Sequence, residues 1–500
     1  MSARKQSGSG VPPLSPEVGR VAPNAPWPVV RIGSALNLIN GRAFKPSEWS
    51  GSGLPIVRIQ NLNNPEAPFN FYDGELPAKF RLKDDDLLFA WSGTPGTSFG
   101  AHIWRGGDAW LNQHIFKVEF DENQFDRRFL RLAINQNLND YIRAAHGGAG
   151  LAHITKGKFE ASEIWCPPLP EQRRIVAEIE TQWAKLDAGV AALKRVQANL
   201  KRYRAAVLQA ACEGKLVPTE AELRRTEGRG PKTASIPREG AINRAVRDEG
   251  VVGSNLTGPT TFETGEQLLQ RILAERRKSW TGRGKYKEPV APDTSNLPAL
   301  PEGWTWASVD ALTGHITSGS RDWSQYYGKG TGTFVLAQNV RPLKLDMAER
   351  QTVDAPAGDA ETERTRVVQN DLLVTIVGAK TGDVCRVPHE LNDHFVCQSV
   401  GLLRPVSAST ARYLELYLAS PENGQAIWKR FIYGQGRPHL GFDELRATAV
   451  ALPPLAEQTR IVAEVERRLS VIEELETLAA TNLARATRLR QAVLKRNLNR

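Results

Sequence analysis

The chain contains one stretch twice, as PPLPEQRRIVAEIE at residues 167–180 and as PPLAEQTRIVAEVE at residues 453–466. Eleven of the fourteen positions are identical, at a constant offset of 286. The same offset still matches Arg204 with Arg490, well beyond the quoted stretch. A register kept over that length without a gap is typical of one long helix, because an insertion would rotate every later side chain off its face.

Each copy is predicted to begin a helix of a coiled coil. Two prolines suit the entrance of a helix, and Glu171 and Glu457 place negative charge in its first turn. Three- and four-residue steps then give seam positions: Val176, Ile179, Trp183, Leu186, Val190, Leu193 and Leu200, interrupted by Gln197 and Arg204, in the first copy, and Val462, Val465, Leu469, Ile472, Glu476, Ala479 and Leu483 in the second. We therefore expect spacer helices at 165–215 and 451–500, packed as an antiparallel pair.

The repeat extends beyond the helices. Asp86-Leu87-Leu88 matches Asp371-Leu372-Leu373 and Gln113 matches Gln398, both at an offset of 285. Short apolar segments broken by Gly, Pro and Asn precede each helix and predict short strands joined by loops. The fold class is therefore α+β, with two similar strand-rich domains separated by two long antiparallel helices in a pseudo-two-fold repeat. The expected order is a disordered tail at 1–26, a first strand-rich domain at 27–164, spacer helix 1 at 165–215, a linker at 216–300 with a short helix at about 264–278, a second strand-rich domain at 301–450, and spacer helix 2 at 451–500.

Composition narrows the class of protein. Five hundred residues predict several domains, and a formal net charge of +10 favours a polyanionic partner. The four cysteines show no metal-ligand spacing, and no apolar run approaches the length of a membrane span. We expect a cytoplasmic protein with reduced thiols and no contact with a membrane.

Motifs for catalysis are missing from the sequence. There is no phosphate-binding loop of the G-x-x-x-x-G-K-[ST] type, no G-x-G-x-x-G, and no Asn- or Asp-Pro-Pro-aromatic tetrad of an amino-methyltransferase. No set of carboxylates suggests a metal-dependent nuclease. His153 and His439 match across the repeat, and either packing or phosphate contact would explain them. We expect no catalytic residue, no metal site and no cofactor in this chain; a divergent DNA-modifying enzyme and a repeat scaffold that binds protein remain the alternatives.

The irregular segments of both domains are rich in side chains that bond base edges and phosphates. The candidate DNA contacts of the first domain are Arg42, Lys45, Arg58, Gln60, Asn61, Asn112, Gln113, His146 and Lys156. Those of the second domain are Arg321, Gln325, Tyr326, Tyr327, Gln338, Asn339, Arg341, Lys380, Gln398, Gln435 and Arg437.

The duplicated P-P-L-x-E-Q-x-R-I-V-A-E helices resemble the specificity (S) subunit of type I restriction–modification systems. Gly303-Trp304-Thr305-Trp306 is similar to the start of a target recognition domain in that family, and Thr264–Lys278 is similar to its central helix. The resemblance covers about Trp27 to Arg500 and implies a sequence-specific DNA-binding subunit that is not an enzyme. The polar insert at 219–261 departs from the family pattern.

The resemblance also implies partners. Each domain would read one half of a bipartite DNA target, and the helices would set the gap, on the order of 18 base pairs for a helix of roughly 60 Å. Two methyltransferase (M) subunits would dock on the helices, and restriction (R) subunits would complete the complex. S-adenosylmethionine, ATP and Mg²⁺ would belong to those partners.

Overall fold

A computed structural model describes residues 27–64, 66–93, 97–144, 152–227, 263–281, 284–319, 322–434 and 436–498. The tail expected at 1–26 lies outside these ranges, as does most of the expected linker at 219–261. The structure divides into two units, which are residues up to Arg195 together with Ala479–Arg500, and Val196–Leu478. Among the described residues, no helix is long and apolar enough to cross a bilayer.

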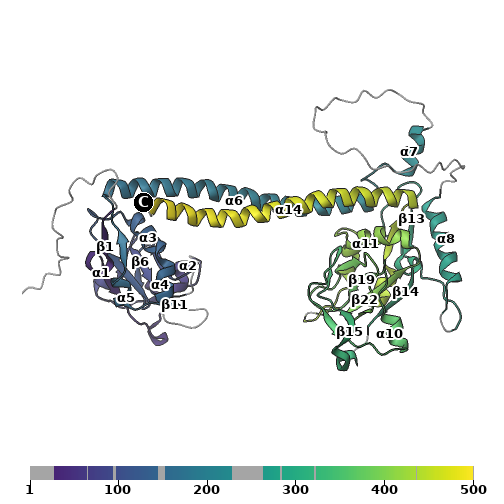
Figure 1. Cartoon of the computed structure of the whole chain (residues 1–500), viewed down its shortest axis with the longest axis horizontal. Helices are drawn as coiled ribbons and strands as arrows, with labels where there is room; N and C mark the ends of the chain where they lie inside the picture. Colours follow the sequence, from purple (N-terminus) through teal and green to yellow (C-terminus); the bar gives the residue numbers. More distant parts are fainter. Residues whose placement is uncertain are drawn as a thin grey trace, which may run out of the picture. The chain divides into compact units, whose positions relative to one another are not determined.

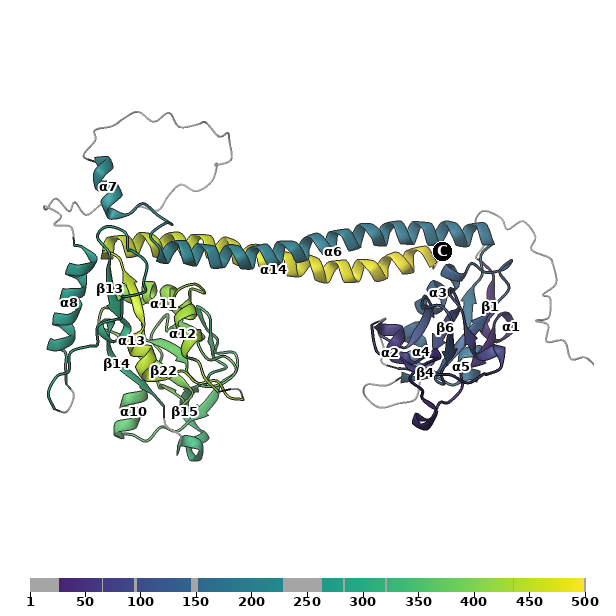
Figure 2. The same ribbon diagram turned by 180° about the vertical axis from the view of Figure 1, so that it is seen from behind.

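The two expected spacer helices are α6 (Leu169–Cys212) and α14 (Leu455–Leu498), each 44 residues long. Both helices run through both units. Figures 1 and 2 show them side by side within each unit. The contacts within each unit make the pair antiparallel.

In the first unit, the start of α6 packs against the end of α14. Ile179 is fully buried, and Leu498 lies in the same core. The Arg490 guanidinium lies 4.4 Å from the centre of the Trp183 ring. Arg490 of α14 also forms an ion pair with Asp187 of α6, so this cation links the two helices at one side of their apolar seam.

In the second unit, the end of α6 packs against the start of α14. Val207 and Ala211 share a core with Val465 and Ile472. Arg204, which interrupts the apolar seam, donates from its guanidinium to Glu476 Oε2 at 3.1 Å. The polar seam residues of the two helices therefore pair with each other, which favours one register of the helices over others.

The first unit is built mainly of short strands. Its strands are β1 (Val29–Arg31), β2 (Asn37–Asn40), β3 (Leu54–Val57), β4 (Asn70–Tyr72), β5 (Arg81–Leu82), β6 (Leu87–Ala90), β7 (Ser92–Gly93), β8 (Gly100–Ile103), β9 (Ala109–Leu111), β10 (Ile115–Glu119), β11 (Ala152–His153) and β12 (Glu163–Trp165). Its short helices are α1 (Ile32–Ala35), η1 (Pro46–Glu48), α2 (Ile59–Asn63), η2 (Ala78–Phe80), α3 (Arg127–Gln136), α4 (Leu138–Ala144) and α5 (Lys156–Glu160). Asp126 caps α3 by accepting from two main-chain N–H groups.

The second unit repeats this plan with larger loops. Its strands are β13 (Thr305–Ser308), β14 (Thr313–Ser318), β15 (Tyr327–Val335), β16 (Val340–Arg341), β17 (Lys344–Leu345), β18 (Gln351–Val353), β19 (Leu372–Thr375), β20 (Val384–Arg386), β21 (His394–Val396), β22 (Val400–Pro405) and β23 (Ala449–Leu452). Its helices are α7 (Glu220–Glu227), α8 (Gly265–Lys278), α9 (Val309–Leu312), η3 (Asp322–Tyr326), α10 (Ala360–Thr365), η4 (Ala408–Thr410), α11 (Ala411–Ala419), α12 (Gly424–Phe431) and α13 (Phe442–Ala447).

The sheets show that the repeat is structural. The order β2-β10-β6-β8 of the first unit corresponds to β14-β22-β19-β20 of the second. A second sheet in each unit contains one parallel pair, β3 with β9 and β15 with β21. Each domain is also tied to its own long helix by an equivalent ion pair, Arg128 with Glu180 and Arg412 with Glu466.

The linker expected at 216–300 is more ordered than the sequence suggested. Glu220–Glu227 forms α7, which is a correction to the linker expected at 219–261. The N–H of Glu220 donates to Glu457 Oε2 at 3.1 Å, and Arg460 pairs with the Glu220 carboxylate. Trp304 Nε1 donates to the other oxygen of Glu457 at 3.0 Å. Glu457 and Arg460 of the second motif copy thus hold in place the segment that follows α6.

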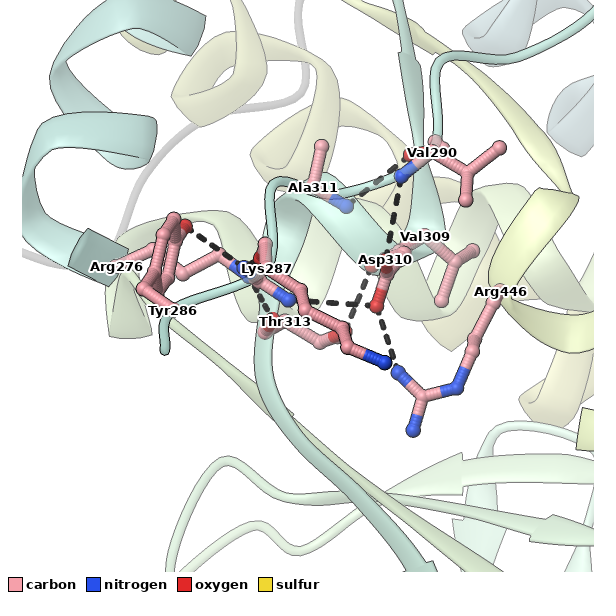
Figure 3. A network of polar contacts seen from close by, with 10 residues as sticks. Arg276, Tyr286, Lys287, Val290, Val309, Asp310, Ala311, Thr313 and Arg446 are labelled. Carbon is pink, nitrogen blue, oxygen red and sulfur yellow. Dashed lines mark hydrogen bonds and ion pairs between the residues drawn. The ribbon is translucent and has the colours of Figure 1, made fainter. Parts of the chain in front are cut away.

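The segment after α8 is also held in place, although the sequence predicted a linker at 281–300. Figure 3 shows the Arg276 guanidinium surrounded by Thr313 O, the Tyr286 hydroxyl and Asp310 Oδ1, at 2.9, 2.7 and 3.4 Å. Arg446 Nη1 donates to the same Asp310 oxygen at 2.7 Å. Two cations therefore share one nearly buried carboxylate, and α8 is fastened to α9 and α13.

Candidate nucleic-acid interface

Three loops meet at one edge of the first domain. One follows β2 at Gly41 and Arg42, one follows β3 at Arg58, and one joins β9 to β10. The N–H of Gln113 donates to Arg42 O at 2.8 Å, and the N–H of Asn112 donates to Val57 O at 3.3 Å. Candidate residues that are far apart in sequence are thereby brought to one edge.

The second domain holds the equivalent loops by equivalent bonds. Gly319 N–H donates to Cys397 O at 3.1 Å, and Cys397 N–H donates to Val335 O at 3.0 Å. A Cβ atom at Gly41 would overlap Asn112 O, and one at Gly319 would overlap Val396 O. Only glycine allows this close approach of two main chains in either domain.

Asn61 and Asn339 have a structural role, which corrects their prediction as DNA contacts. Asn61 is 3% exposed; its Oδ1 accepts from Arg58 N at 3.0 Å, and its Nδ2 donates to Ala67 O at 3.1 Å. Asn339 is 1% exposed and makes the same bonds, from Leu336 N at 2.9 Å and to loop carbonyls. Their neighbours Gln60 and Gln338 are exposed, so the asparagine shapes the loop that presents the glutamine.

His153 and His439 lie next to the same loops. His153 pairs with Ser92 through β11 and β7, and its ring lies 4.7 Å from that of Trp91. His439 bridges to Val377, the equivalent position of the second domain. These contacts agree with the packing interpretation of both histidines rather than with exposure to phosphate.

The remaining candidate residues of the first domain differ in exposure and in the contacts that they make within the protein. Arg42 is half-buried and pairs with Glu48; a main-chain bond from Lys45 and then Arg42 itself lower the pKa of that carboxyl. Arg58 lies 5.6 Å from the centre of the Trp49 ring. Lys156 donates to Leu38 O at 3.0 Å and is therefore partly occupied within the protein. Lys45 is exposed, and Asn112 and Gln113 are half-buried.

In the second domain, the candidates form a more exposed set. Gln325, Tyr327, Lys380 and Arg437 are exposed, whereas Tyr326, Arg341 and Gln398 are half-buried. His146, Arg321 and Gln435 lie outside the described residues. These placements leave individual base contacts as predictions.

The sequence reading missed several residues at these edges. Trp49 is 42% exposed beside Arg58. Phe431 and Tyr433 are 47% and 63% exposed, and Lys429 and Arg430 precede them in the chain. The signal was present as KRFIYGQGR at residues 429–437, where basic and aromatic residues alternate before glycines.

The first unit should lose stability in mild acid through His102. Burial lowers the pKa of this half-buried histidine on β8, whose Nε2 lies 2.9 Å from Ser98 O. Below about pH 6.5 the unfolded chain binds a proton that the folded chain resists, so stability falls as pH falls. The protection factors of the β8 amides, which correct for the slower intrinsic exchange at lower pH, should therefore fall between pH 7.5 and 5.5. A His102→Gln variant should show a weaker pH dependence, and an unchanged one would contradict this assignment.

Comparison with known proteins shows which family the chain resembles. Residues 24–188 match the model of the type I restriction modification DNA specificity domain. The chain is 25% identical over 471 residues to the type I restriction enzyme EcoBI specificity subunit of Escherichia coli, covering 94% of this chain and 84% of that protein. Over nearly its whole length, the chain is therefore similar to type I specificity subunits.

A further relative and a solved structure agree with this assignment. The chain is 21% identical to the EcoKI specificity subunit of Escherichia coli strain K12, covering 94% of this chain and 87% of that one. A structure described as showing complex assembly and conformational transition of the type I R-M system shares its fold, with a TM-score of 0.56, 20% identity, and coverage of 96% and 99%. Both relatives are specificity subunits of type I restriction enzymes.

Proposed function

We propose that the specificity subunit reads a bipartite DNA sequence, with one domain for each half-site. The observation that carries the proposal is the pair of matching loop edges. Gly41 and Gly319 approach a neighbouring strand in the same way, and Asn61 and Asn339 shape equivalent loops. Such a pair suits two readers with one construction and different targets.

Comparison of the two domains distinguishes residues that hold the loops in both domains from residues that differ between the domains. Equivalent main-chain positions carry Arg58 in the first domain and Leu336 in the second. Asn112 corresponds in the same way to Cys397. Cys397 is buried, so the accessible residues at divergent positions, Arg58 and Asn112, are the best candidates for sequence-specific contacts. Arginine favours guanine and asparagine favours adenine in the major groove.

The long helices offer a surface for partner proteins. Val471, Leu475 and Leu478 are 49%, 43% and 51% exposed and lie along one face of α14. Tyr203 of α6 is 46% exposed, and its hydroxyl accepts from Arg468 at 3.4 Å in the same unit. We propose that a methyltransferase helix packs on this apolar face, that two M subunits and R subunits complete the complex in the cytoplasm, and that S-adenosylmethionine, ATP and Mg²⁺ bind to those partners.

The proposed docking surface on α14 leads to a prediction of how added negative charge affects binding of the methyltransferase subunit. The double variant Leu475→Glu and Leu478→Glu should lower affinity for the methyltransferase subunit by at least about 100-fold, because two carboxylates would be desolvated in the interface. Ser470→Glu places one carboxylate on another exposed face of α14 and should have little effect. Titration by light scattering or calorimetry measures both. Equal losses in both variants would argue against an apolar dock on this face.

The proposed function is tested by mapping methylated DNA in cells that carry this gene with its methyltransferase gene. We expect one motif of two short half-sites with a fixed gap. Exchange of residues 27–164 for those of a relative should change one half-site and leave the other. Absence of DNA binding by the assembled complex, even at low salt, would favour a protein-binding scaffold instead, and S-adenosylmethionine binding by the isolated chain would favour an enzyme.

A further inference from the structure

The end of α12 and the hairpin after it form an exposed aromatic and basic cluster on the second domain. We define this cluster as Lys429, Arg430, Phe431, Tyr433 and Arg437. Tyr433 is 63% exposed and Phe431 is 47% exposed, whereas the neighbouring Trp428 is fully buried. The fold therefore uses one aromatic residue of this segment as core and leaves the other two in solvent.

Tyr433 is exposed but firmly held. Its N–H donates to His439 O at 3.2 Å, and His439 N–H donates to Tyr433 O at 2.8 Å, which closes the hairpin. The His439 and Tyr433 rings stack with centres 5.8 Å apart and planes 18° apart. Gly434 sits at a φ of +93°, so the tip of the hairpin depends on glycine. An aromatic ring held this way loses little conformational entropy when it binds.

The hairpin belongs to the same edge as the candidate recognition loops. Gly378 N–H donates to Pro438 O at 2.9 Å, which joins the hairpin to the loop after β19. Ile376 N–H donates to Ser399 O at 2.9 Å, which joins that loop to the one containing Gln398. Tyr433 therefore lies one loop away from residues predicted to contact bases.

The basic side chains of the cluster are unpaired in the part of the chain that the structure describes. Lys429, Arg430 and Arg437 are exposed and form neither an ion pair nor a side-chain hydrogen bond with any described residue. Most arginines nearby are paired, such as Arg412 with Glu415 and Arg446 with Asp310. Lys380, on the adjoining loop, is exposed as well. Unpaired cations around exposed rings fit a polyanion with flat apolar faces, which is a nucleic acid.

We propose that Tyr433, supported by Phe431, is a wedge that enters the base stack of duplex DNA in the half-site read by the second domain. Arg437, Lys429 and Arg430 contact the phosphates on either side. This inference rests on the proposed function and adds to it a local distortion of the DNA. An aromatic ring between bases unstacks them, and the cost depends on which bases are separated, so the wedge itself contributes to sequence preference.

The sequence of the first domain has no aromatic residue at the positions that correspond to Phe431 and Tyr433. The corresponding segment, at an offset of 286, is AHGGAG at residues 145–150. The distortion should therefore be confined to one half-site. This asymmetry distinguishes a wedge from any distortion that both domains cause alike.

The test uses the assembled complex with its methyltransferase and duplexes that carry the mapped target. 2-Aminopurine is placed in turn at positions of the second half-site other than the methylated adenine. The wild type and Tyr433→Phe should raise fluorescence at one step, whereas Tyr433→Ala should lose that rise and bind about tenfold more weakly. Arg437→Gln should reduce the slope of log affinity against log salt by about one. Trp280→Ala, which removes another exposed aromatic residue of the second unit, should change neither.

Two results would overturn the wedge. One is a Tyr433→Ala complex that binds DNA with unchanged affinity and an unchanged fluorescence profile. The other is a Tyr433→Ala chain that assembles poorly with the methyltransferase, although the fraction that does assemble binds DNA normally. That result would make the cluster a protein-docking site. If the wild-type complex methylates no bipartite motif, the proposed function fails first. A mapped motif with no effect of Tyr433→Ala removes the wedge alone.

Discussion

Replacing Arg404 by methionine should lower the free energy of unfolding of the second domain by about 3–5 kcal/mol. Asp371 is fully buried beside β19, and Arg404 donates to both of its carboxylate oxygens at 2.8 Å. Without the arginine, a carboxylate would remain in the core with the main-chain N–H of Val368 as a donor. The loss should be smaller at pH 5 than at pH 7.5, because burial raises the pKa of Asp371 and protonation removes the charge.

The first domain provides a matched control for this variant. Asp86, the counterpart of Asp371, pairs with Lys117 at 2.9 Å, and their side chains are 21% and 16% exposed. Lys117→Met should therefore cost less than Arg404→Met, because the Asp86 side chain keeps some access to water and that of Asp371 has none. Hydrogen exchange of β19 and β22 peptides in increasing urea measures the first variant, and that of β6 and β10 peptides measures the second. Equal losses would show that burial of Asp371 is not the cause.

Gly319→Ala should abolish specific reading by the second domain, with specific DNA affinity falling by at least about 100-fold toward the nonspecific level. The new methyl group would overlap Val396 O, which is main chain and has no alternative rotamer. The loop after β14 must then separate from β21, and the recognition edge loses its shape. Because α14 lies elsewhere in the second unit, assembly with the methyltransferase should persist.

Gly41→Ala should have the same effect through the first domain, since the added atom would overlap Asn112 O. Gly157→Ala serves as the control, because its new methyl group would meet nothing within 4 Å and its backbone is not left-handed. Electrophoretic mobility or fluorescence anisotropy with target and scrambled duplexes measures each complex. Retained specificity in Gly319→Ala would mean that this loop is not part of the reading edge.

Local patterns in the sequence were sufficient for the helices and for the repeat. The seam from Val176 to Leu200 followed from a period that depends only on the geometry of one helix, and its members are buried or half-buried. The helix expected at about 264–278 is α8, and the structure adds that Thr264 and Gln267 form a capping box at its start. These features require no knowledge of distant residues.

The recognition edge required pairings that no local pattern contains. The parallel pairing of β3 with β9 places Asn112 beside Val57, which lies more than fifty residues earlier in the chain. Composition alone grouped Asn61 with Gln60 as possible base contacts, although the fold buries the asparagine and exposes the glutamine. An amide side chain is equally suited to bond a base or a main chain, so only its burial decides between the two roles.

The sequence by itself determined two copies of one strand-rich unit, each followed by a long amphipathic helix, because duplicated residues and helical periods can be recognised without a fold. Only the tertiary structure decided which polar side chains hold loops and which face solvent. It also decided that Glu457 fastens the chain after α6 and that the exposed Tyr433 has its main chain paired with that of His439. Those roles depend on strand pairing and burial between residues distant in the chain, and the hydrogen-bonding capacity of a side chain is the same in either place.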